Sequence, residues 1–470
     1  MTDLALLAPE IVLVIAALAL IIVARRVERA LPAAIFVVLA AAASVVAGLA
    51  FSGQGEVATS GFAGSISMDG YTHFFKMLFA ATLALAALLS VNHLDAERIR
   101  PAEFYSLLLL SSTGMMLAAS ATDLLIVYLG LELMTLCSYV MVGITRERSA
   151  SNEAAIKYFL LASFASALFL YGISLTYGVT GATDYEGIAA AALQRGQTQD
   201  PLLLAAVVLV GIGLAFKIAV VPFHAWAPDA YQGASTPISA FLAASSKAAG
   251  LAALGRVGLI AFAPQQPVWS EILVWLAGLS MAGGSLLAFS QTNMKRMLAY
   301  SSIAHAGYAL LGLVSVTPDG VTATMAYASA YAFMTLGAFG VVIGLGPRGE
   351  EIANFRGLAT TAPGTAAVML LFLLSLTGIP PTAGFAAKFG VILNVVSSGH
   401  MLLAVLAVLC SVVSAFFYLR VAVFMYMNEP QGAAPARLPA VVSAALAVAA
   451  FMTIVGGMFP EAFAAWTIPP

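Results

Sequence analysis

Charged residues are scarce in this sequence. Only 9% of its 470 residues are charged, 61% are hydrophobic, and the mean hydropathy of +0.99 lies outside the range of soluble domains. The formal net charge of −2 is too close to zero to indicate a nucleic-acid surface. The composition therefore predicts an integral membrane protein and no nucleic-acid partner.

Cysteine and the motifs of redox or nucleotide chemistry are nearly absent as well. The two cysteines, Cys137 and Cys410, lie in apolar segments and form no CxxC pair, so they predict neither a metal site nor a disulfide. The sequence has no P-loop, no GxGxxG after a strand, no cysteine cluster for an iron–sulfur centre and no histidine pair at haem-like spacing. We therefore expect no cofactor and no metal in this chain.

Apolar runs recur from end to end instead. Their length of about 18 residues or more is typical of transmembrane α-helices rather than of barrel strands, which alternate over about ten residues. The sequence predicts an all-α polytopic membrane protein of about 14 transmembrane helices. These helices lie near residues 4–24, 31–51, 71–93, 103–119, 122–143, 155–178, 201–222, 237–260, 270–290, 297–316, 319–345, 361–396, 400–427 and 438–458.

Basic residues favour one side of this predicted membrane. The side reached after the first helix carries twelve: Arg25, Arg26, Arg29, Arg98, Arg100, Arg146, Arg148, Lys295, Arg296, Arg348, Arg356 and Arg437. The other side carries two, Arg195 and Arg256. By the positive-inside rule the first side is cytoplasmic, so both termini are predicted on the opposite side.

Two predicted spans are interrupted by proline and glycine. The seventh runs into VVPFHAWAPDAYQGASTP, and the twelfth, at 361–396, contains GIPPTAG. Paired discontinuous helices are typical of transporters built from two inverted repeats. The predicted division is helices 1–3 (1–93), a first five-helix repeat (94–265), a second, inverted five-helix repeat (266–430), and helix 14 with the C-terminus (431–470).

Four ionisable residues are predicted at membrane depth: Glu132, Lys217, Lys247 and Lys388. Each such charge costs roughly 2.5–3.5 kcal/mol on insertion and usually faces a protein interior or a water-filled cavity. An ion pair of Lys217 with Glu132 that only fixes helix packing is the alternative to a proton site, although one carboxylate cannot neutralise three lysines. Snorkelling toward the membrane surface is predicted for the basic residues nearer helix ends, Lys76, Lys157 and Arg420.

Two histidines extend this polar set. His305 lies ten residues beyond Lys295, about 15 Å along a helix and near the middle of the membrane, and His224 follows the proline of the seventh helix. Imidazole can pass a proton between its nitrogens, so each histidine is a candidate relay, with a packing role as the alternative. Nearby hydroxyls could hold ordered water: Ser245, Ser246, Ser301 and Ser302.

Long motifs around these residues resemble a known family. FKIAVVPFHAWAPDAYQGASTPISAFLAASSKAAG and NMKRMLAYSSIAHAGYALLG are similar to the antiporter-like membrane subunits of respiratory complex I, the proton-translocating NADH:quinone oxidoreductase, which are related to cation/proton antiporter subunits. Among these subunits the chain looks most like subunit N. LGLELMTLCSYVMVG is subunit-N-like, Lys388 stands where subunit M typically has glutamate, and only EAFAAWTIPP follows the last helix, whereas subunit L continues into a long amphipathic helix.

The resemblance implies a role for each polar residue. It makes Glu132 the helix 5 glutamate, Lys217 the helix 7 lysine, Lys247 the connecting helix 8 lysine and Lys388 the terminal helix 12 lysine, with His305 on the polar axis between two half-channels. His224, at the helix 7 break, is the sixth candidate for proton transfer.

The resemblance also implies the setting. We expect a non-redox subunit of a proton translocase in the bacterial cytoplasmic (inner) membrane, with both termini periplasmic. FMN, iron–sulfur clusters and quinone are expected in other subunits, and subunits M, K and J and membrane lipids are the expected partners. The alternatives are a subunit of a multisubunit cation/proton antiporter and a non-transporting structural subunit.

Overall fold

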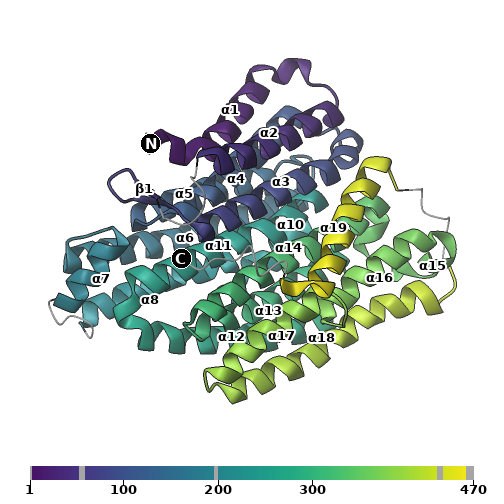
Figure 1. Cartoon of the computed structure of the whole chain (residues 1–470). Helices are drawn as coiled ribbons and strands as arrows, with labels where there is room; N and C mark the ends of the chain where they lie inside the picture. The colour runs from purple at the N-terminus through teal and green to yellow at the C-terminus, as the bar shows by residue number, and fades with distance from the viewer. Residues whose placement is uncertain (1–2, 52–58, 195–199, 431–437, 462–470) are drawn as a thin grey trace.

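The computed structural model describes residues 3–51, 59–194, 200–430 and 438–461, which form a bundle of helices (Figure 1). The long helices are α1 (Ala8–Ile22), α2 (Ala30–Phe51), α3 (Gly70–Ala96), α4 (Pro101–Ser120), α5 (Leu124–Val142), α6 (Ser149–Thr180), α8 (Pro201–Ile218), α12 (Gln266–Phe289), α13 (Met294–Val314), α14 (Pro318–Leu345), α18 (Met401–Met427) and α19 (Ala440–Met458). The shorter helices are α7 (Tyr185–Gln194), α9 (Trp226–Gly233), α10 (Thr236–Phe241), α11 (Lys247–Arg256), α15 (Leu358–Thr361), α16 (Pro363–Thr377) and α17 (Ala383–Ser397).

Short helical turns join these elements. The 3₁₀ turns are η1 (Asp3–Leu7), η2 (Ala24–Arg26), η6 (Ala263–Gln265), η7 (Gly346–Glu350) and η8 (Ile352–Phe355). Two π-helical turns, η4 (Leu242–Ser246) and η5 (Val257–Ala261), stand on either side of α11 within one continuous helical rod. The sequence predicted a single regular span here, because a π turn needs no proline or other breaker that a pattern would reveal.

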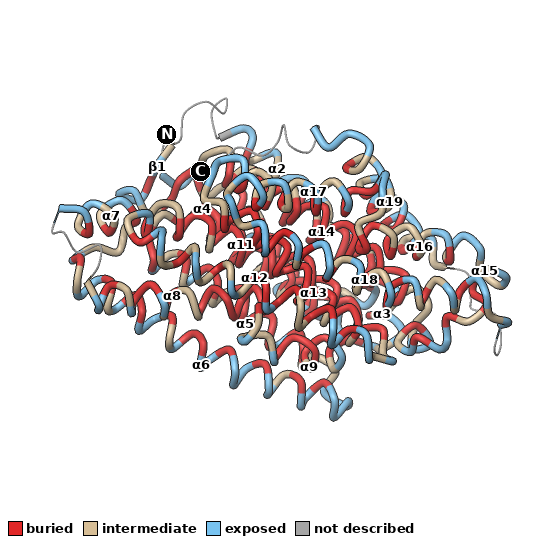
Figure 2. Tube along the Cα trace, turned by 90° about the horizontal axis from the view of Figure 1, so that it is seen from below, coloured by how far each residue is buried: buried red, intermediate tan, exposed pale blue. Residues whose placement is uncertain are grey.

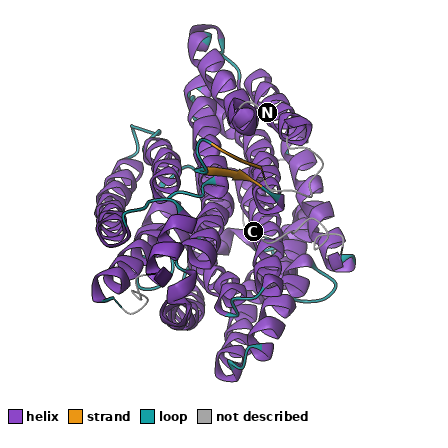
Figure 3. Cartoon of the chain, turned by 60° about the vertical axis from the view of Figure 1, so that its left-hand side comes forward, coloured by secondary structure: helices purple, strands orange, loops and turns teal. Residues whose placement is uncertain are grey.

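The prediction of an all-α polytopic membrane protein is confirmed. Within the described residues, thirteen helical segments are long and apolar enough to cross a membrane, and two shorter apolar helices, α16 and α17, occupy the remaining predicted segment. One element was not foreseen, an antiparallel hairpin of β1 (Thr59–Gly61) and β2 (Ile66–Met68), drawn in orange in Figure 3. Its strands are too short to produce a readable alternation of polar and apolar residues.

The helices begin where the sequence places caps and prolines. Side chains of Asp69, Asp123, Asp200, Asn293 and Thr317 accept hydrogen bonds from the first backbone N–H groups of α3, α5, α8, α13 and α14. These groups have no partner inside the helix, so a capping side chain satisfies donors that would otherwise be left in an apolar setting.

The centre of the molecule is formed by three spans. In the segments Thr236–Ala261, Met294–Val314 and Pro318–Glu350, 94%, 94% and 89% of the most apolar stretch is buried. Figure 2 shows this buried centre surrounded by helices that alternate between buried and exposed residues. Their outward faces are apolar, as expected of a surface that meets lipid. Examples are Ile15, Leu18, Leu160, Phe164, Leu409 and Val412.

Two of the predicted spans are interrupted in the structure. The helix α8 ends at Ile218, followed by Ala219 with a left-handed φ of 59°, and α9 begins only at Trp226. Likewise α16 ends at Thr377, followed by Gly378 with φ of 89°. Each break contains one cis X–Pro bond, at Pro222 and at Pro381. The predicted span 201–222 therefore ended four residues too late, since the left-handed residue stops the helix before the proline does.

Other sequence predictions have mixed outcomes. The four-part division at residues 93, 265 and 430 and the inverted relation of the two repeats stay predictions. Arg195 and Arg437 lie outside the described residues, as does the end of the chain beyond Glu461. Arg256 was counted among the basic residues on the second side of the membrane, and this was wrong: it is the last residue of α11, inside a continuous helix, and is 2% exposed.

Candidate functional site

Lys217 and Glu132 meet at the end of α8. The ammonium Nζ of Lys217 lies 2.9 Å from Glu132 Oε1 on α5, and it donates a second hydrogen bond of 2.7 Å to Thr135 Oγ1. Ser166 on α6 donates to the same carboxylate oxygen at 2.5 Å. Lys217 is fully enclosed, whereas 19% of the Glu132 side chain is exposed. Side chains from three helices thus provide the hydrogen bonds of this ion pair, and the Glu132 carboxylate stays partly exposed.

Lys247 is held by backbone rather than by a carboxylate. Its Nζ donates hydrogen bonds of 2.9 Å to the carbonyl of Ile218 and 2.9 Å to the carbonyl of Ser302. Ile218 is the last residue of α8, directly after Lys217. The last carbonyls of a helix lack partners within it and carry the negative end of the helix dipole, so they stabilise a cation. The break in α8 therefore links the two lysines through one peptide.

Lys388 has an equivalent environment at the second break. Its Nζ donates to the carbonyls of Leu376 and Thr377, at 3.0 and 2.9 Å, and to Ser411 Oγ at 3.3 Å. These carbonyls belong to the last two residues of α16. The same Nζ lies 4.7 Å from the ring centroid of Tyr308, a cation–π contact. Each broken helix thus presents its C-terminal carbonyls to a buried lysine from another element.

His305 lies on α13 and is 2% exposed. Its Nδ1 is 2.6 Å from the hydroxyl of Tyr327 on α14, and its Nε2 is 3.3 Å from the hydroxyl of Tyr418 on α18. The Tyr331 ring packs beside the imidazole, with centroids 5.1 Å apart. Both ring nitrogens therefore have a hydroxyl partner, as a buried imidazole requires.

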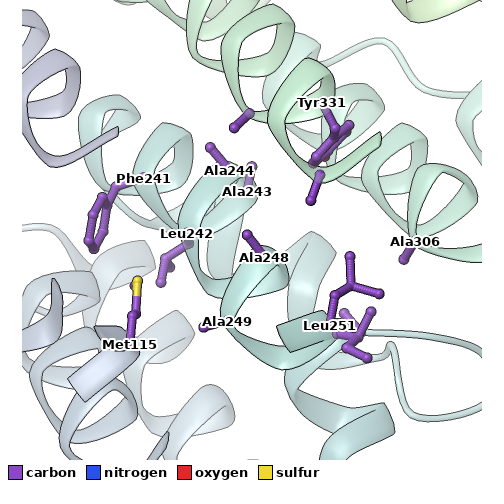
Figure 4. Close-up of a cluster of buried hydrophobic side chains, with 14 of the residues drawn as sticks. Met115, Phe241, Leu242, Ala243, Ala244, Ala248, Ala249, Leu251, Ala306 and Tyr331 are labelled. Atoms are coloured by element: carbon purple, nitrogen blue, oxygen red, sulfur yellow. The ribbon is translucent and has the colours of Figure 1, made fainter. Parts of the chain in front are cut away.

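Apolar side chains enclose the rod that carries Lys247. Figure 4 shows Leu242, Ala244, Ala248 and Leu251 along this rod, with Met115 approaching from another helix. All of these side chains are buried. Because such surroundings offer no polar partners, the two carbonyls are the groups that solvate the Lys247 ammonium among the described residues.

Not every predicted site residue joins this arrangement. His224 lies in the segment between α8 and α9, and its Nδ1 is buried without a hydrogen-bond partner among the described residues. The structure gives it no hydrogen bond to Lys217 or Lys247. Of the four predicted serines, Ser301 bonds to Tyr418, Ser302 contributes its carbonyl to Lys247, and the hydroxyl of Ser246 bonds back to Leu242.

Lys76 does not snorkel, contrary to the prediction. It is 4% exposed, and its Nζ lies 2.7 Å from the buried Glu10 of α1. The prediction failed because it compared each lysine only with its own helix end, and Glu10 is far away in sequence. Lys157 is half exposed and bonds to Asp229, and Arg420 donates to the carbonyls of Phe289 and Gln291 at the end of α12.

Arg256 forms a further buried charge pair at the end of α11 remote from Lys247. Its two terminal nitrogens bond to the Asp69 carboxylate at 2.7 and 2.8 Å, and one of them also donates to Thr72 Oγ1 at 2.9 Å. Burial raises the pKa of Asp69, but the hydrogen bonds and charge of Arg256 outweigh it and lower the pKa to about 2. This ion pair thus connects the helix that carries Lys247 to the start of α3.

Sequence reasoning missed the tyrosines near His305 and the backbone carbonyls that bind the buried lysines. A tyrosine in an apolar helix looks like any other core aromatic, so Tyr327, Tyr418 and Tyr308 gave no signal of their own. Thr135 could have been found, because it follows Glu132 by three residues and shares its helix face. Backbone ligands carry no sequence signature at all.

Comparison with known proteins identifies similar chains. Residues 121–414 match the family model described as NADH:quinone oxidoreductase/Mrp antiporter, TM. The chain is 46% identical over 463 residues to NADH-quinone oxidoreductase subunit N 2 of Rhizobium meliloti, covering 97% of this chain and 95% of that protein. It is 43% identical to subunit N of Desulfovibrio desulfuricans, covering 99% and 96%.

Solved structures with the same fold extend the comparison. A chain of respiratory complex I from Thermus thermophilus with bound Aureothin superposes with a TM-score of 0.83 at 32% identity, over 97% of this chain and 98% of that one. A chain of the Mrp complex from Dietzia sp. gives a TM-score of 0.86 at 21% identity, over 98% and 95%. The second likeness, at that identity, concerns the fold alone.

Proposed function

This chain belongs to the NADH:quinone oxidoreductase/Mrp antiporter membrane family, and from that premise we propose that it is a proton-translocating membrane subunit of NADH:quinone oxidoreductase. Relatives named subunit N match it over nearly its whole length, which favours this function over that of an antiporter subunit. The Mrp chain, at 21% identity, supports a shared fold and no more.

The observation that carries the mechanism is the bonding of Lys247 and Lys388 to neutral carbonyls. A lysine paired with a carboxylate leaves a buried negative charge unpaired when it releases its proton. A lysine held by neutral carbonyls leaves no such charge behind. Lys217 is paired with Glu132. When these two side chains separate, Lys217 loses its neutralising carboxylate, which favours release of its proton. Protons would pass along Glu132, Lys217, Lys247, His305 and Lys388, with His224 near the break in α8.

The driving reaction lies outside this chain. We propose that FMN, iron–sulfur clusters and quinone belong to other subunits and that this subunit performs no redox step. Subunits M, K and J and membrane lipids are its proposed neighbours. The proposed location is the bacterial inner membrane, with both termini periplasmic.

Two measurements test this function. The complex purified through a tag on this chain should show flavin and iron–sulfur absorption; a complex that lacks both and exchanges cations for protons would favour the antiporter alternative. In that complex Lys217→Ala should assemble, because alanine suits a helix, and should lower coupled NADH:quinone turnover about a hundredfold or more, as expected when a positioned proton-transfer group is lost.

The control for Lys217→Ala is Lys157→Ala, which removes a half-exposed lysine from a surface pair with Asp229. This control should change turnover little, because exposed ion pairs contribute little. Wild-type turnover and proton-to-electron ratio in assembled Lys217→Ala would leave the ion pair with a packing role only.

A further inference from the structure

His305 and three other side chains form a continuous hydrogen-bonded chain across three helices. Ser301 Oγ and the Tyr418 hydroxyl are bonded, the Tyr418 hydroxyl reaches Nε2 of His305, and Nδ1 of His305 reaches the Tyr327 hydroxyl at 2.6 Å. Ser301 and His305 are on α13, Tyr418 is on α18 and Tyr327 is on α14. All four residues are at most 2% exposed, so bulk water does not interrupt the chain.

The groups in this chain have the chemistry of a proton wire. A neutral imidazole has one donor and one acceptor nitrogen, and a hydroxyl can donate and accept at once. The chain can therefore be polarised in either direction. Reversing it moves one proton from end to end without ionising any member.

Each end of the chain adjoins a residue that contacts one of the two carbonyl-bound lysines. Ser301 precedes Ser302, whose carbonyl accepts a hydrogen bond from Lys247 Nζ at 2.9 Å. At the other end the ring of Tyr327 stacks on that of Tyr308, with centroids 6.5 Å apart and 16° between planes. Lys388 Nζ lies 4.7 Å from the Tyr308 centroid, on which it forms its cation–π contact. The chain thus lies between a residue next to a Lys247 ligand and a ring packed against a Lys388 contact.

We propose that Tyr418 and Tyr327 are proton-relay residues that connect His305 to the lysines on either side. This inference rests on the proposed proton-translocating function and deepens it. The two hydroxyls satisfy both nitrogens of one buried imidazole from two different helices, and the same geometry places a group that can donate and accept a proton on each side of His305.

The relay step balances with water as the carrier at each end. A water-borne proton binds the Ser301 oxygen while the original Ser301 proton moves to the Tyr418 oxygen, and the original Tyr418 proton moves to Nε2 of His305. The Nδ1 proton of His305 moves to the Tyr327 oxygen, and the original Tyr327 proton leaves to a second water. Each broken O–H or N–H bond is replaced by a new one. His305 ends in its other tautomer, and rotation of the hydroxyls and the ring resets the chain.

The test uses Tyr327→Phe, Tyr418→Phe and the double variant in the assembled complex in sealed vesicles. Each change removes one hydroxyl and keeps the ring, so packing is retained. Each single variant should slow coupled proton transfer roughly a hundredfold or more, the lower end of what a positioned proton-transfer group contributes. Because one missing link already breaks a wire, the double variant should be no worse than the more defective single variant.

The matched control is Tyr105→Phe on α4. Tyr105 is fully buried and donates a 3.0 Å hydrogen bond to the carbonyl of Ala87, away from the lysines. Losing this hydroxyl costs a similar hydrogen bond and should leave the proton-to-electron ratio unchanged. If one of the relay variants does not assemble, the other decides alone, since either link suffices to break the wire.

Three outcomes separate the possibilities. Normal turnover and ratio in both single variants would overturn the relay. Losses that multiply in the double variant would also overturn it, because independent packing contributions add in free energy. His305→Ala and Lys247→Ala in the same vesicles distinguish failure of the tyrosine relay from failure of the proposed proton-translocating function. If these two variants are defective while the tyrosine variants are normal, only the relay fails. If they too are normal, the proposed function of the axis fails.

Discussion

Lys247 donates a hydrogen bond to the carbonyl of Ile218, the residue directly after Lys217, at 2.9 Å. A buried lysine on one helix is thus bonded to the broken end of the helix that carries another buried lysine. Any movement of the α8 terminus changes both the Lys217–Glu132 pair and the solvation of Lys247. The break in α8 therefore couples two buried charges that sequence places 30 residues apart.

The first prediction concerns Lys247→Arg. The guanidinium keeps the positive charge and can still donate to the carbonyls of Ile218 and Ser302, but it stays charged in proteins and cannot release its proton. We expect this variant to impair proton pumping about as severely as Lys247→Ala, roughly a hundredfold or more. The measurement is the proton-to-electron ratio in vesicles.

Lys157→Arg is the control, because Lys157 is half exposed and its pairs with Glu153 and Asp229 accept either cation. Guanidinium is larger than ammonium, so assembly of both variants is checked on native gels. A normal ratio in well-assembled Lys247→Arg would show that Lys247 never has to deprotonate.

The second prediction concerns Gly378, at the end of α16. Its φ is 89°, and a Cβ added there would come within 2.9 Å of Lys388 Cδ. Gly378→Ala should therefore cost about 1–3 kcal/mol of backbone strain and displace the Lys388 side chain from its carbonyls. We expect reduced proton pumping with retained assembly.

Gly364→Ala is the matched control on the same helix. A Cβ at Gly364 meets nothing within 4 Å, and alanine suits a helix better than glycine. This variant should be neutral or slightly stabilising. Equal pumping by the two alanine variants would contradict the idea that the shape of the break positions Lys388.

Sequence reasoning predicted the spans and the charged residues, but it predicted few of the partners. The spans follow from length and hydropathy, which act locally along the chain. The Lys217–Glu132 pair was one of two open interpretations, and the structure brings the two residues together. Roles in proton transfer for Glu132, Lys217, Lys247, Lys388, His305 and His224 stay predictions.

What could not be predicted depends on tertiary packing. The partners of Lys247 and Lys388 are carbonyls at helix ends, which any sequence can supply. Glu10 and Lys76 are 66 residues apart, and no helical period relates them. The tyrosines of His305 are recognised as relay candidates only when three helices are assembled around one imidazole.

The third prediction concerns the buried pair of Asp69 and Arg256. Asp69→Ala leaves the enclosed guanidinium of Arg256 without its carboxylate, and breaking a buried pair in this way costs about 3–5 kcal/mol. The melting temperature of the purified complex should fall clearly. Glu103→Ala, which breaks the exposed pair of Glu103 with Arg100, should cost only about 0–1 kcal/mol.

The pH dependence of this difference follows from the pKa of Asp69, lowered from 3.8 to about 2. A carboxyl whose pKa is lowered in the folded protein contributes stability that is fully present above its unfolded pKa and is lost as the pH falls through the folded pKa. The melting temperature of the wild-type complex should therefore exceed that of Asp69→Ala by the same margin at about pH 5 and about pH 8. A margin that shrinks between these values would contradict a strongly paired carboxylate.

The fourth prediction concerns topology, because the predicted excess of basic residues on one side of the membrane predicts a direction for α6. With 32 residues, α6 is about 48 Å long at helical rise and exceeds the roughly 30 Å hydrocarbon core. Exposed Glu147 precedes this helix and exposed Glu186 follows it.

In a background lacking Cys137 and Cys410, Glu147→Cys should react with an impermeant maleimide only from the cytoplasmic side, and Glu186→Cys only from the opposite side. Labelling after detergent treatment verifies that each thiol is reachable in the complex. If both cysteines reacted from the same side of intact vesicles, α6 would not cross the membrane, and the two repeats could not have opposite orientations.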